Sequence, residues 1–105
     1  MLYKTRPGVE LVYICGSHLL IATRPAWAFC PKVTEITRGA ALAWSLLEKG
    51  KSLEAITQFL AIMSRRPIYE MQDQLDDLLE KLVAQGYLLM VDSDVEYGYY
   101  DKDMK

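Results

Sequence analysis

The sequence predicts one α+β domain in which a small antiparallel sheet of three short strands is followed by three helices. Short β-rich apolar runs fill the first third of the 105-residue chain, and apolar residues recur at helical spacing from position 37 onward. Because so short a chain cannot bury two independent cores, we expect a single domain over residues 1–91. The remaining residues, 92–105, form an acidic tail that contains three tyrosines.

The first two strands are expected to form a hairpin. Val9 to Ile14 and His18 to Thr23 are short apolar runs rich in β-formers, and Cys15-Gly16-Ser17 between them is a suitable turn. Val33 to Ile36 is the best candidate for the third strand. Pro31 favours an edge position for that strand, because a central strand needs the amide hydrogen that proline lacks.

Capping signals then separate three helices. Thr37 and Ser52 can cap the first two, and Gly50 and Gly86 can end the first and third. The third helix is expected from about Glu70 to Gln85. A small sheet and three short helices with a tight glycine turn resemble a winged helix-turn-helix in content. The predicted buried face of the second helix consists of Leu53, Ile56, Phe59, Leu60 and Met63.

The third helix has an unusually wide apolar stripe. At about 100° per residue, the stripe spans roughly 140° of the helix surface. Such a stripe either belongs entirely to the core or also forms the wall of a groove. One border carries Gln74, Lys81 and Gln85, and the other carries Asp76 and Glu80. The stripe itself consists of Met71, Leu75, Leu78, Leu79, Leu82 and Val83.

Composition and charge narrow the function classes. Hydrophobic residues make up 51% and charged residues 25%, which is typical of a globular domain, and the net charge is −2. No apolar run approaches the roughly 18 residues of a membrane span, so we expect a cytoplasmic protein without a membrane partner. The third helix carries five acidic residues and one lysine, a net charge of −4, which disfavours insertion into nucleic acid.

The sequence offers little for catalysis or metal binding. Cys15, Cys30 and His18 are its only cysteines and histidine, too few for a zinc site built from Cys and His. The two cysteines form either a disulfide or two small buried thiols. No phosphate-binding loop or cofactor motif is present, so we expect no enzyme activity, no cofactor and no metal.

Several segments together resemble the PqqD-like family over roughly residues 5–90. The run Ile36 to Gly50 resembles the family's first helix, and Gly50 to Ile56 resembles its Gly-x-Thr-Val-x-Glu-Ile segment. Arg6-Pro7-Gly8-Val9 fits a common opening. Leu78, Leu79, Leu82, Val83, Gly86, Tyr87 and Leu88 resemble the final helix and its ending.

The sequence also departs from this pattern. Thr37 replaces an Asn, and Tyr87 replaces a Trp. The segment 24–32 lacks the usual glycine turn, which leaves the strand boundaries there open.

The resemblance implies a non-catalytic peptide-binding chaperone. Family members recognise the leader of a ribosomally made precursor peptide and present it to a modifying enzyme, often a radical S-adenosylmethionine protein, or to a maturation protease. The leader is held as a strand added to the third strand, against the third helix. On this chain, backbone groups around Val33, Thr34 and Glu35 would pair with the leader. Lys32 and Lys81 either pair with acidic leader residues or remain solvated. The apolar wall would consist of Met71, Leu75, Leu78 and Leu82.

Two other functions remain open, and so does a homodimer. The chain could be a small assembly subunit that docks on a larger enzyme, or, less favourably, a winged-helix DNA-binding regulator. The candidate interface anchors are Trp27, Phe29, Trp44, Tyr97, Tyr99 and Tyr100, although Trp44 also suits the core.

Overall fold

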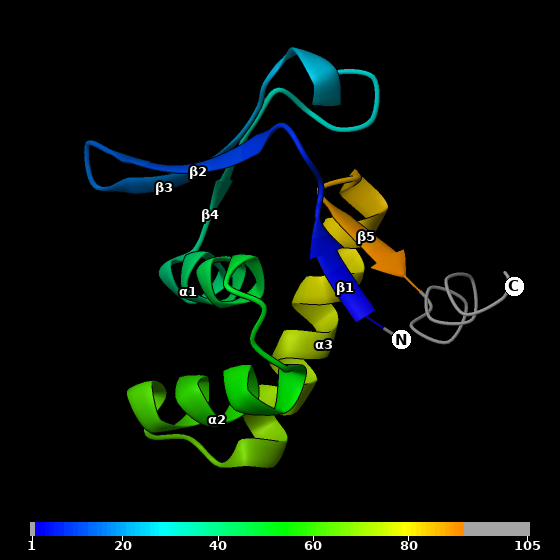
Figure 1. Cartoon of the computed structure of the whole chain (residues 1–105). Helices are drawn as coiled ribbons and strands as arrows, with labels where there is room; N and C mark the ends of the chain where they lie inside the picture. Colours follow the sequence, from blue (N-terminus) through cyan, green and yellow to red (C-terminus); the bar gives the residue numbers. More distant parts are fainter. Residues whose placement is uncertain (1, 92–105) are drawn as a thin grey trace, which may run out of the picture.

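The computed structural model describes residues 2–91 and confirms the α+β class and the winged helix-turn-helix arrangement (Figure 1). The tail over 92–105, with its three tyrosines, lies outside the described residues. The elements in chain order are β1 (Leu2–Thr5), β2 (Val9–Ile14), β3 (Ser17–Ala22), a 3-10 turn η1 (Arg24–Ala26), β4 (Val33–Ile36), α1 (Arg38–Glu48), α2 (Leu53–Ser64), α3 (Ile68–Gln85) and β5 (Leu88–Val91).

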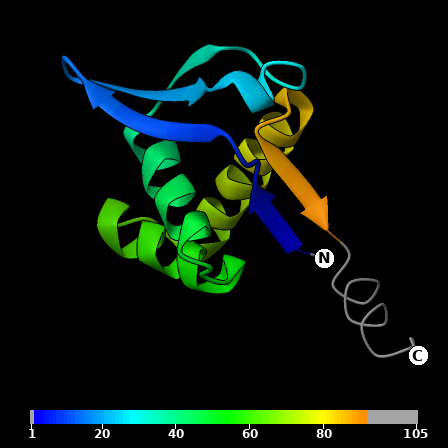
Figure 2. The same ribbon diagram turned by 45° about the horizontal axis from the view of Figure 1, so that its top comes forward.

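Two separate antiparallel sheets form. β2, β3 and β4 are neighbours in that order, as expected, and β1 pairs with β5 in a second sheet. Both views show β1 and β5 side by side next to the helices (Figures 1 and 2). Tyr87 to Val91 is an apolar run that, from the sequence, is either a short strand or a packed tail, and the sequence does not predict β1. A four-residue strand has little local signal, and β1 depends on a partner at the other end of the domain.

The hairpin turn is shorter than expected. Cys15 and Gly16 form it alone, with φ angles of 51° and 81°, whereas Ser17 already belongs to β3. Two successive residues with positive φ match the turns that suit the right-handed twist of a two-residue hairpin.

The predicted helix caps are confirmed. The Thr37 hydroxyl accepts a hydrogen bond from the Ala40 amide at 3.1 Å, and Ser52 does the same for Ala55 at 3.1 Å. α3 starts at Ile68 rather than near Glu70, because Pro67 occupies its N-cap position. None of the helices within residues 2–91 combines the length and apolar character needed to cross a bilayer.

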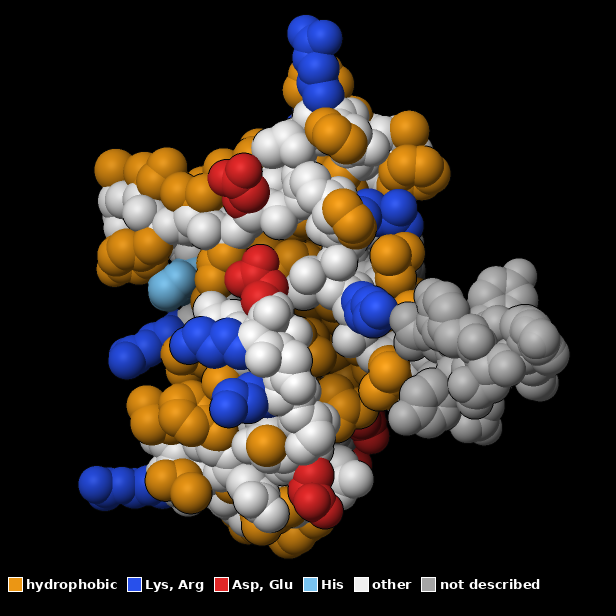
Figure 3. Space-filling view, viewed as in Figure 1, with side chains coloured by type: hydrophobic (Ala, Val, Ile, Leu, Met, Phe, Trp, Pro, Cys, Tyr) orange, Lys and Arg blue, Asp and Glu red, His pale blue; other side chains and the backbone are white. Residues whose placement is uncertain are grey.

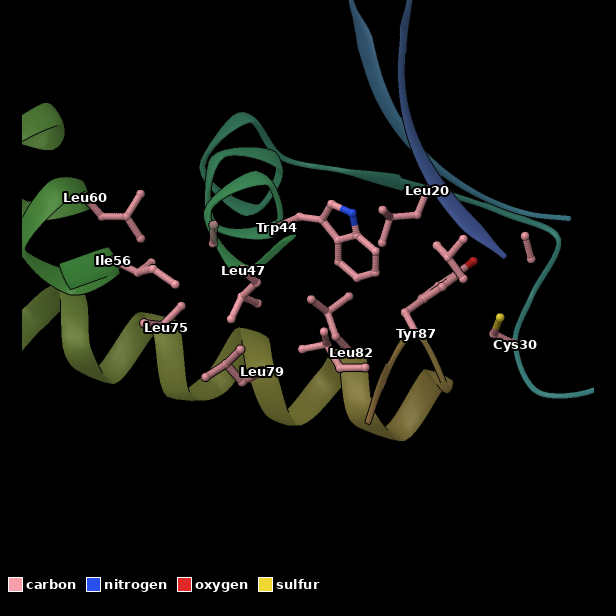
Figure 4. Packing of buried hydrophobic residues seen from close by; sticks show 14 of the residues in the cluster. Leu20, Cys30, Trp44, Leu47, Ile56, Leu60, Leu75, Leu79, Leu82 and Tyr87 are labelled. Atoms are coloured by element: carbon pink, nitrogen blue, oxygen red, sulfur yellow. The ribbon is translucent and has the colours of Figure 1, made fainter. Parts of the chain in front are cut away.

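The core lies between the three-stranded sheet and the helices. Figure 4 shows the Trp44 ring between Leu20 of the sheet and Leu82 of α3, so Trp44 is a core residue rather than an interface anchor. The expected burial of Phe59 and Met63 is wrong, because their side chains are 38% and 54% exposed. α2 instead buries Ile56, Thr57, Leu60 and Ala61. The helix turns a narrower face to the core than its apolar content suggested.

Gly86, at the end of α3, packs closely against the loop that precedes β4. Its φ of 90° ends the helix in the left-handed conformation. A Cβ atom there would lie 2.0 Å from the Phe29 carbonyl oxygen, so the site needs glycine for space as well as for conformation.

The two cysteines are free thiols in different surroundings, which corrects the expectation that they are either a disulfide or two buried thiols. Cys15 is exposed at the hairpin tip, whereas Cys30 is buried. The Cys30 thiol donates a hydrogen bond to the Ala26 carbonyl at 3.3 Å, and burial raises its pKa.

Candidate functional site

β4 is an edge strand with backbone groups directed away from its sheet. The Ala22 amide donates to the Lys32 carbonyl at 2.8 Å, which identifies this pair as hydrogen-bonded. Such pairs alternate along an antiparallel ladder, so Thr34 and Ile36 also point their backbone groups toward β3. The amides and carbonyls of Val33 and Glu35 therefore face outward, where an added strand can bind them.

A hollow of about 470 Å³ lies between β4 and the C-terminal half of α3. Its β-side wall runs from Thr34 to Thr37, and Ala40 of α1 also lines it. Residues of α3 form the opposite wall: Leu78, Lys81, Leu82, Ala84 and Gln85.

A second hollow of about 140 Å³ extends along α3 toward its N-terminus. Both hollows are lined by Thr37, Ala40 and Leu78, so they form one continuous depression, here called the β4–α3 groove. Met71 and Leu75 line the second hollow, although both are almost fully buried. Leu78 is only partly buried and lines both hollows, so a ligand in either of them can contact its side chain.

The groove-facing side of α3 differs from the rest of that helix. At about 100° per residue, Gln74, Leu78, Lys81 and Gln85 fall within about 60° of one another. None of the acidic residues of α3 lines the groove hollows, although Asp77 is only about 40° from Lys81 around the helix. The helix is therefore acidic overall, whereas its groove side carries a lysine and two amides. Among the residues that line the groove, Glu35 is the acidic one.

Tyr87 holds the beginning of β4 against the end of α3. Its fully buried hydroxyl donates to the Pro31 carbonyl at 2.8 Å and lies 2.7 Å from the Thr34 hydroxyl. Since the one phenolic hydrogen is used at Pro31, Thr34 is the donor in the second bond. Burial raises the pKa of Tyr87, an effect that the bond from Thr34 partly offsets. Tyr87, one of the two residues that depart from the family pattern, thus positions one wall of the groove.

Cations and aromatic rings gather where β4 begins. The Lys32 ammonium and the Arg24 guanidinium lie 4.5 and 5.6 Å from the centroid of the exposed Trp27 ring. Trp27 is held by a 2.7 Å hydrogen bond from its indole to the Ala22 carbonyl. Two residues after Trp27, the Phe29 ring has the Arg6 guanidinium 4.4 Å from its centroid. Trp27 and Phe29 are thus partly exposed aromatic side chains, and each ring has at least one cation near its centroid.

Most of the residues predicted for the site come together in the groove. Its lining includes Thr34, Glu35, Met71, Leu75, Leu78, Lys81 and Leu82. Two predicted residues do not line it. The Val33 side chain is 57% exposed on the other face of β4, and Lys32 lies against Trp27. Val33 still contributes its outward backbone groups.

Several groove residues were not predicted. Gln74 and Gln85 border the apolar stripe at helical spacing beside Lys81, a signal already visible in the sequence. The local pattern indicates only a cap at Thr37 and a helix residue at Ala40. Their position in the groove depends on how α1 packs beside β4, which no local pattern reveals.

Two solved structures resemble this fold. One is "TbiB1 in Complex with the TbiA(beta) Leader Peptide", with a TM-score of 0.70, 20% sequence identity, and coverage of 85% of this chain and 98% of that one. The other is "Lasso peptide synthetase B1 complexed with the leader peptide", with a TM-score of 0.68, 20% identity, and coverage of 86% and 100%. This chain has the fold of these two B1 proteins, here called the B1 fold. The match confirms the fold that the sequence resemblance implied.

The similarity is one of structure rather than sequence. No protein-family model matches the chain, and no curated protein matches it significantly. The shared fold covers 85–86% of this chain and nearly the whole length of both matched chains.

Proposed function

We propose that this chain binds the leader of a ribosomally made precursor peptide in the β4–α3 groove and presents it to a modifying enzyme. The observation that carries the proposal is the coincidence of two features. The open edge of β4 offers paired amides and carbonyls at Val33 and Glu35, and an apolar groove lies directly beside it. Strand addition needs the first for affinity and the second for specificity.

The pleat of β4 predicts how the peptide would lie. Residues opposite each other in a ladder place their side chains on the same face. Peptide residues opposite Thr34 and Ile36 would therefore point toward Leu78 and the groove, whereas residues opposite Val33 and Glu35 would face solvent. The proposal thus requires apolar peptide residues at alternate positions.

The B1 fold supports this assignment, since both matched structures are complexes with a leader peptide. The partner enzyme is of a class that modifies or cleaves the precursor, such as a radical S-adenosylmethionine protein or a maturation protease. In this proposal the chain contributes binding and orientation, and the chemistry belongs to the enzyme.

An NMR titration tests the proposal. Labelled full-length chain is titrated with the leader half of the precursor peptide encoded beside it. We expect shifts at residues 33–36 and 74–85 and little change at the β2–β3 hairpin tip. A well-dispersed spectrum with no shifts at high peptide excess, or with shifts only outside the groove, would overturn the proposal.

The exposed surface of α2 favours a second role, docking on a larger enzyme. Phe59, Ile62 and Met63 of α2 and Tyr69 of α3 are exposed, and hydrophobic side chains gather over α2 in Figure 3. This surface is compatible with leader binding, because the chain must approach its enzyme to deliver a peptide. Substituting Ile62 with Arg should abolish co-purification with the enzyme if docking uses this surface, and leader binding should remain unchanged.

A further inference from the structure

The cations at the start of β4 lack acidic partners. Within residues 2–91, no carboxylate oxygen lies within 4.0 Å of the charged groups of Arg6, Arg24 or Lys32. Arg24 and Lys32 are held near the same Trp27 ring, where their like charges repel each other. An anion placed beside the ring would relieve this repulsion.

The backbone ladder available to a peptide ends at the same place. Val33 is the last outward-facing residue of β4 in this direction, and the next outward position is Pro31. Pro31 has no amide hydrogen, and its carbonyl already accepts the hydrogen bond from Tyr87. A peptide that continues past Val33 therefore loses its main-chain partners just where Lys32 and Arg24 begin.

The charge along the groove favours the same kind of ligand. Lys81 lines the groove, whereas no carboxylate of α3 does. Glu35 belongs to β4 but lies three residues after Lys32, toward the other end of the strand.

We propose that the peptide carries an Asp or Glu at the position that passes Pro31, and that Lys32 and Arg24 bind its carboxylate beside Trp27. This inference rests on the proposed function and specifies the class of peptide. The cation–aromatic cluster replaces the missing backbone hydrogen bonds with a charge-assisted contact and thereby sets the register of the peptide on β4.

Selection from a random peptide display library tests this inference, because the selection does not require the natural ligand. The full chain is used as bait, in parallel with Lys32→Glu and with Lys49→Glu, a matched charge reversal at the end of α1. We expect the wild-type chain and Lys49→Glu to enrich peptides with one acidic residue at a constant distance from the apolar positions. Lys32→Glu should lose that acidic preference.

Affinities of one selected peptide then measure the contact. Lys32→Glu should weaken binding about tenfold, and changing the peptide's acidic residue to Lys should restore most of the loss. The difference should shrink in high salt. If selected peptides require Leu78 but show no acidic preference and bind Lys32→Glu as tightly as wild type, the carboxylate contact is wrong and the groove proposal stands. If no peptide is enriched, or if Leu78→Arg binds the selected peptides normally, the proposed function itself fails.

Discussion

Among residues 2–91, nothing pairs with the outer edges of β2 and β4 in the three-stranded sheet, and the two edges have very different surroundings. The Thr23 amide donates to the Gly8 carbonyl at 2.7 Å, so by alternation the outward positions of β2 include Leu11 and Tyr13. β2 has six residues, whereas β4 has four, so length alone would favour β2 as a template for another strand.

The difference lies in what accompanies each edge. β4 has the groove beside it, and at its start Tyr87 holds it by a hydrogen bond and the cations Lys32 and Arg24 lie over Trp27. The end of β2 carries the exposed side chains of Tyr13 and Ile14 at the hairpin tip. An unpaired edge supplies hydrogen bonds to any strand, and its neighbours decide which strand binds. The packing of α3, more than the edge itself, therefore makes β4 the candidate site.

The largest expected effect concerns the junction that holds the groove together. Gly86→Ala should lower the free energy of unfolding by about 3 kcal/mol, because a Cβ would strain the positive φ and collide with the Phe29 carbonyl. Gly16→Ala is the matched control. It has a similar φ of 81° and no atom within 4 Å of an added Cβ, so we expect a loss of about 1 kcal/mol. Urea denaturation measures both, and equal losses would contradict the role of the close contact.

Changes to Leu78 in the apolar wall should distinguish most clearly between peptide binding at the β4 edge and binding at the β2 edge. Leu78→Arg should weaken leader binding about a hundredfold, which is about 2.7 kcal/mol, because a charge would occupy the point where the two hollows meet. Ile62→Arg, on the exposed side of α2, is the control and should bind normally. Leu78→Ala, which avoids the charge, should weaken binding about tenfold. Calorimetry with circular dichroism checks binding and folding together, and unchanged affinity in folded Leu78→Arg would refute the groove as the site.

Removing one outward donor tests the edge directly. Val33→Pro should reduce leader affinity about tenfold, because the amide lost is one that faces away from β3 and toward the peptide. Leu11→Pro removes the corresponding donor from β2 and should leave affinity unchanged. Calorimetric titration of both variants measures the difference. A loss in Leu11→Pro with normal binding in Val33→Pro would move the peptide from β4 to the edge of β2.

The smallest effect on stability or binding is expected from loss of the Tyr87 hydroxyl, which connects the end of α3 to the start of β4. Tyr87→Phe should destabilise the fold by about 1 kcal/mol, because the Pro31 carbonyl and the Thr34 hydroxyl both lose a partner. Tyr13→Phe at the exposed hairpin tip is the control and should be neutral. Thermal melting monitored by circular dichroism measures both, and a neutral Tyr87→Phe would show that packing alone positions β4.

The same residue predicts a pH effect. Burial raises the pKa of Tyr87 in the folded chain, so its contribution to stability is present below the ordinary tyrosine pKa. That contribution is lost as the pH rises through the raised pKa. The stability of wild type should therefore fall more steeply in strong alkali than that of Tyr87→Phe, as urea melts at increasing pH would show.

The parts of the groove that depend on the spacing of residues within one helix or strand could be predicted from the sequence. The wide stripe on α3 identified Leu78 and Lys81, and Pro31 identified β4 as an edge. The prediction did not extend to Thr37 and Ala40, because a residue enters a groove through the approach of another element. It also misjudged Phe59 and Met63, because apolar spacing reveals an amphipathic face but not how much of that face finds a partner.

By itself, the sequence determined the local elements of this protein: the hairpin, the edge strand, the caps, the glycine stops and the two-sided character of α3. These follow from backbone conformation and short-range periodicity, which act over a few residues. Tertiary structure alone decided the pairing of β1 with β5, the contribution of α1 to the lining of the groove, and the hydrogen bond of Tyr87 with Pro31. Each of these joins segments far apart in the chain, and such contacts depend on the packing of the whole core.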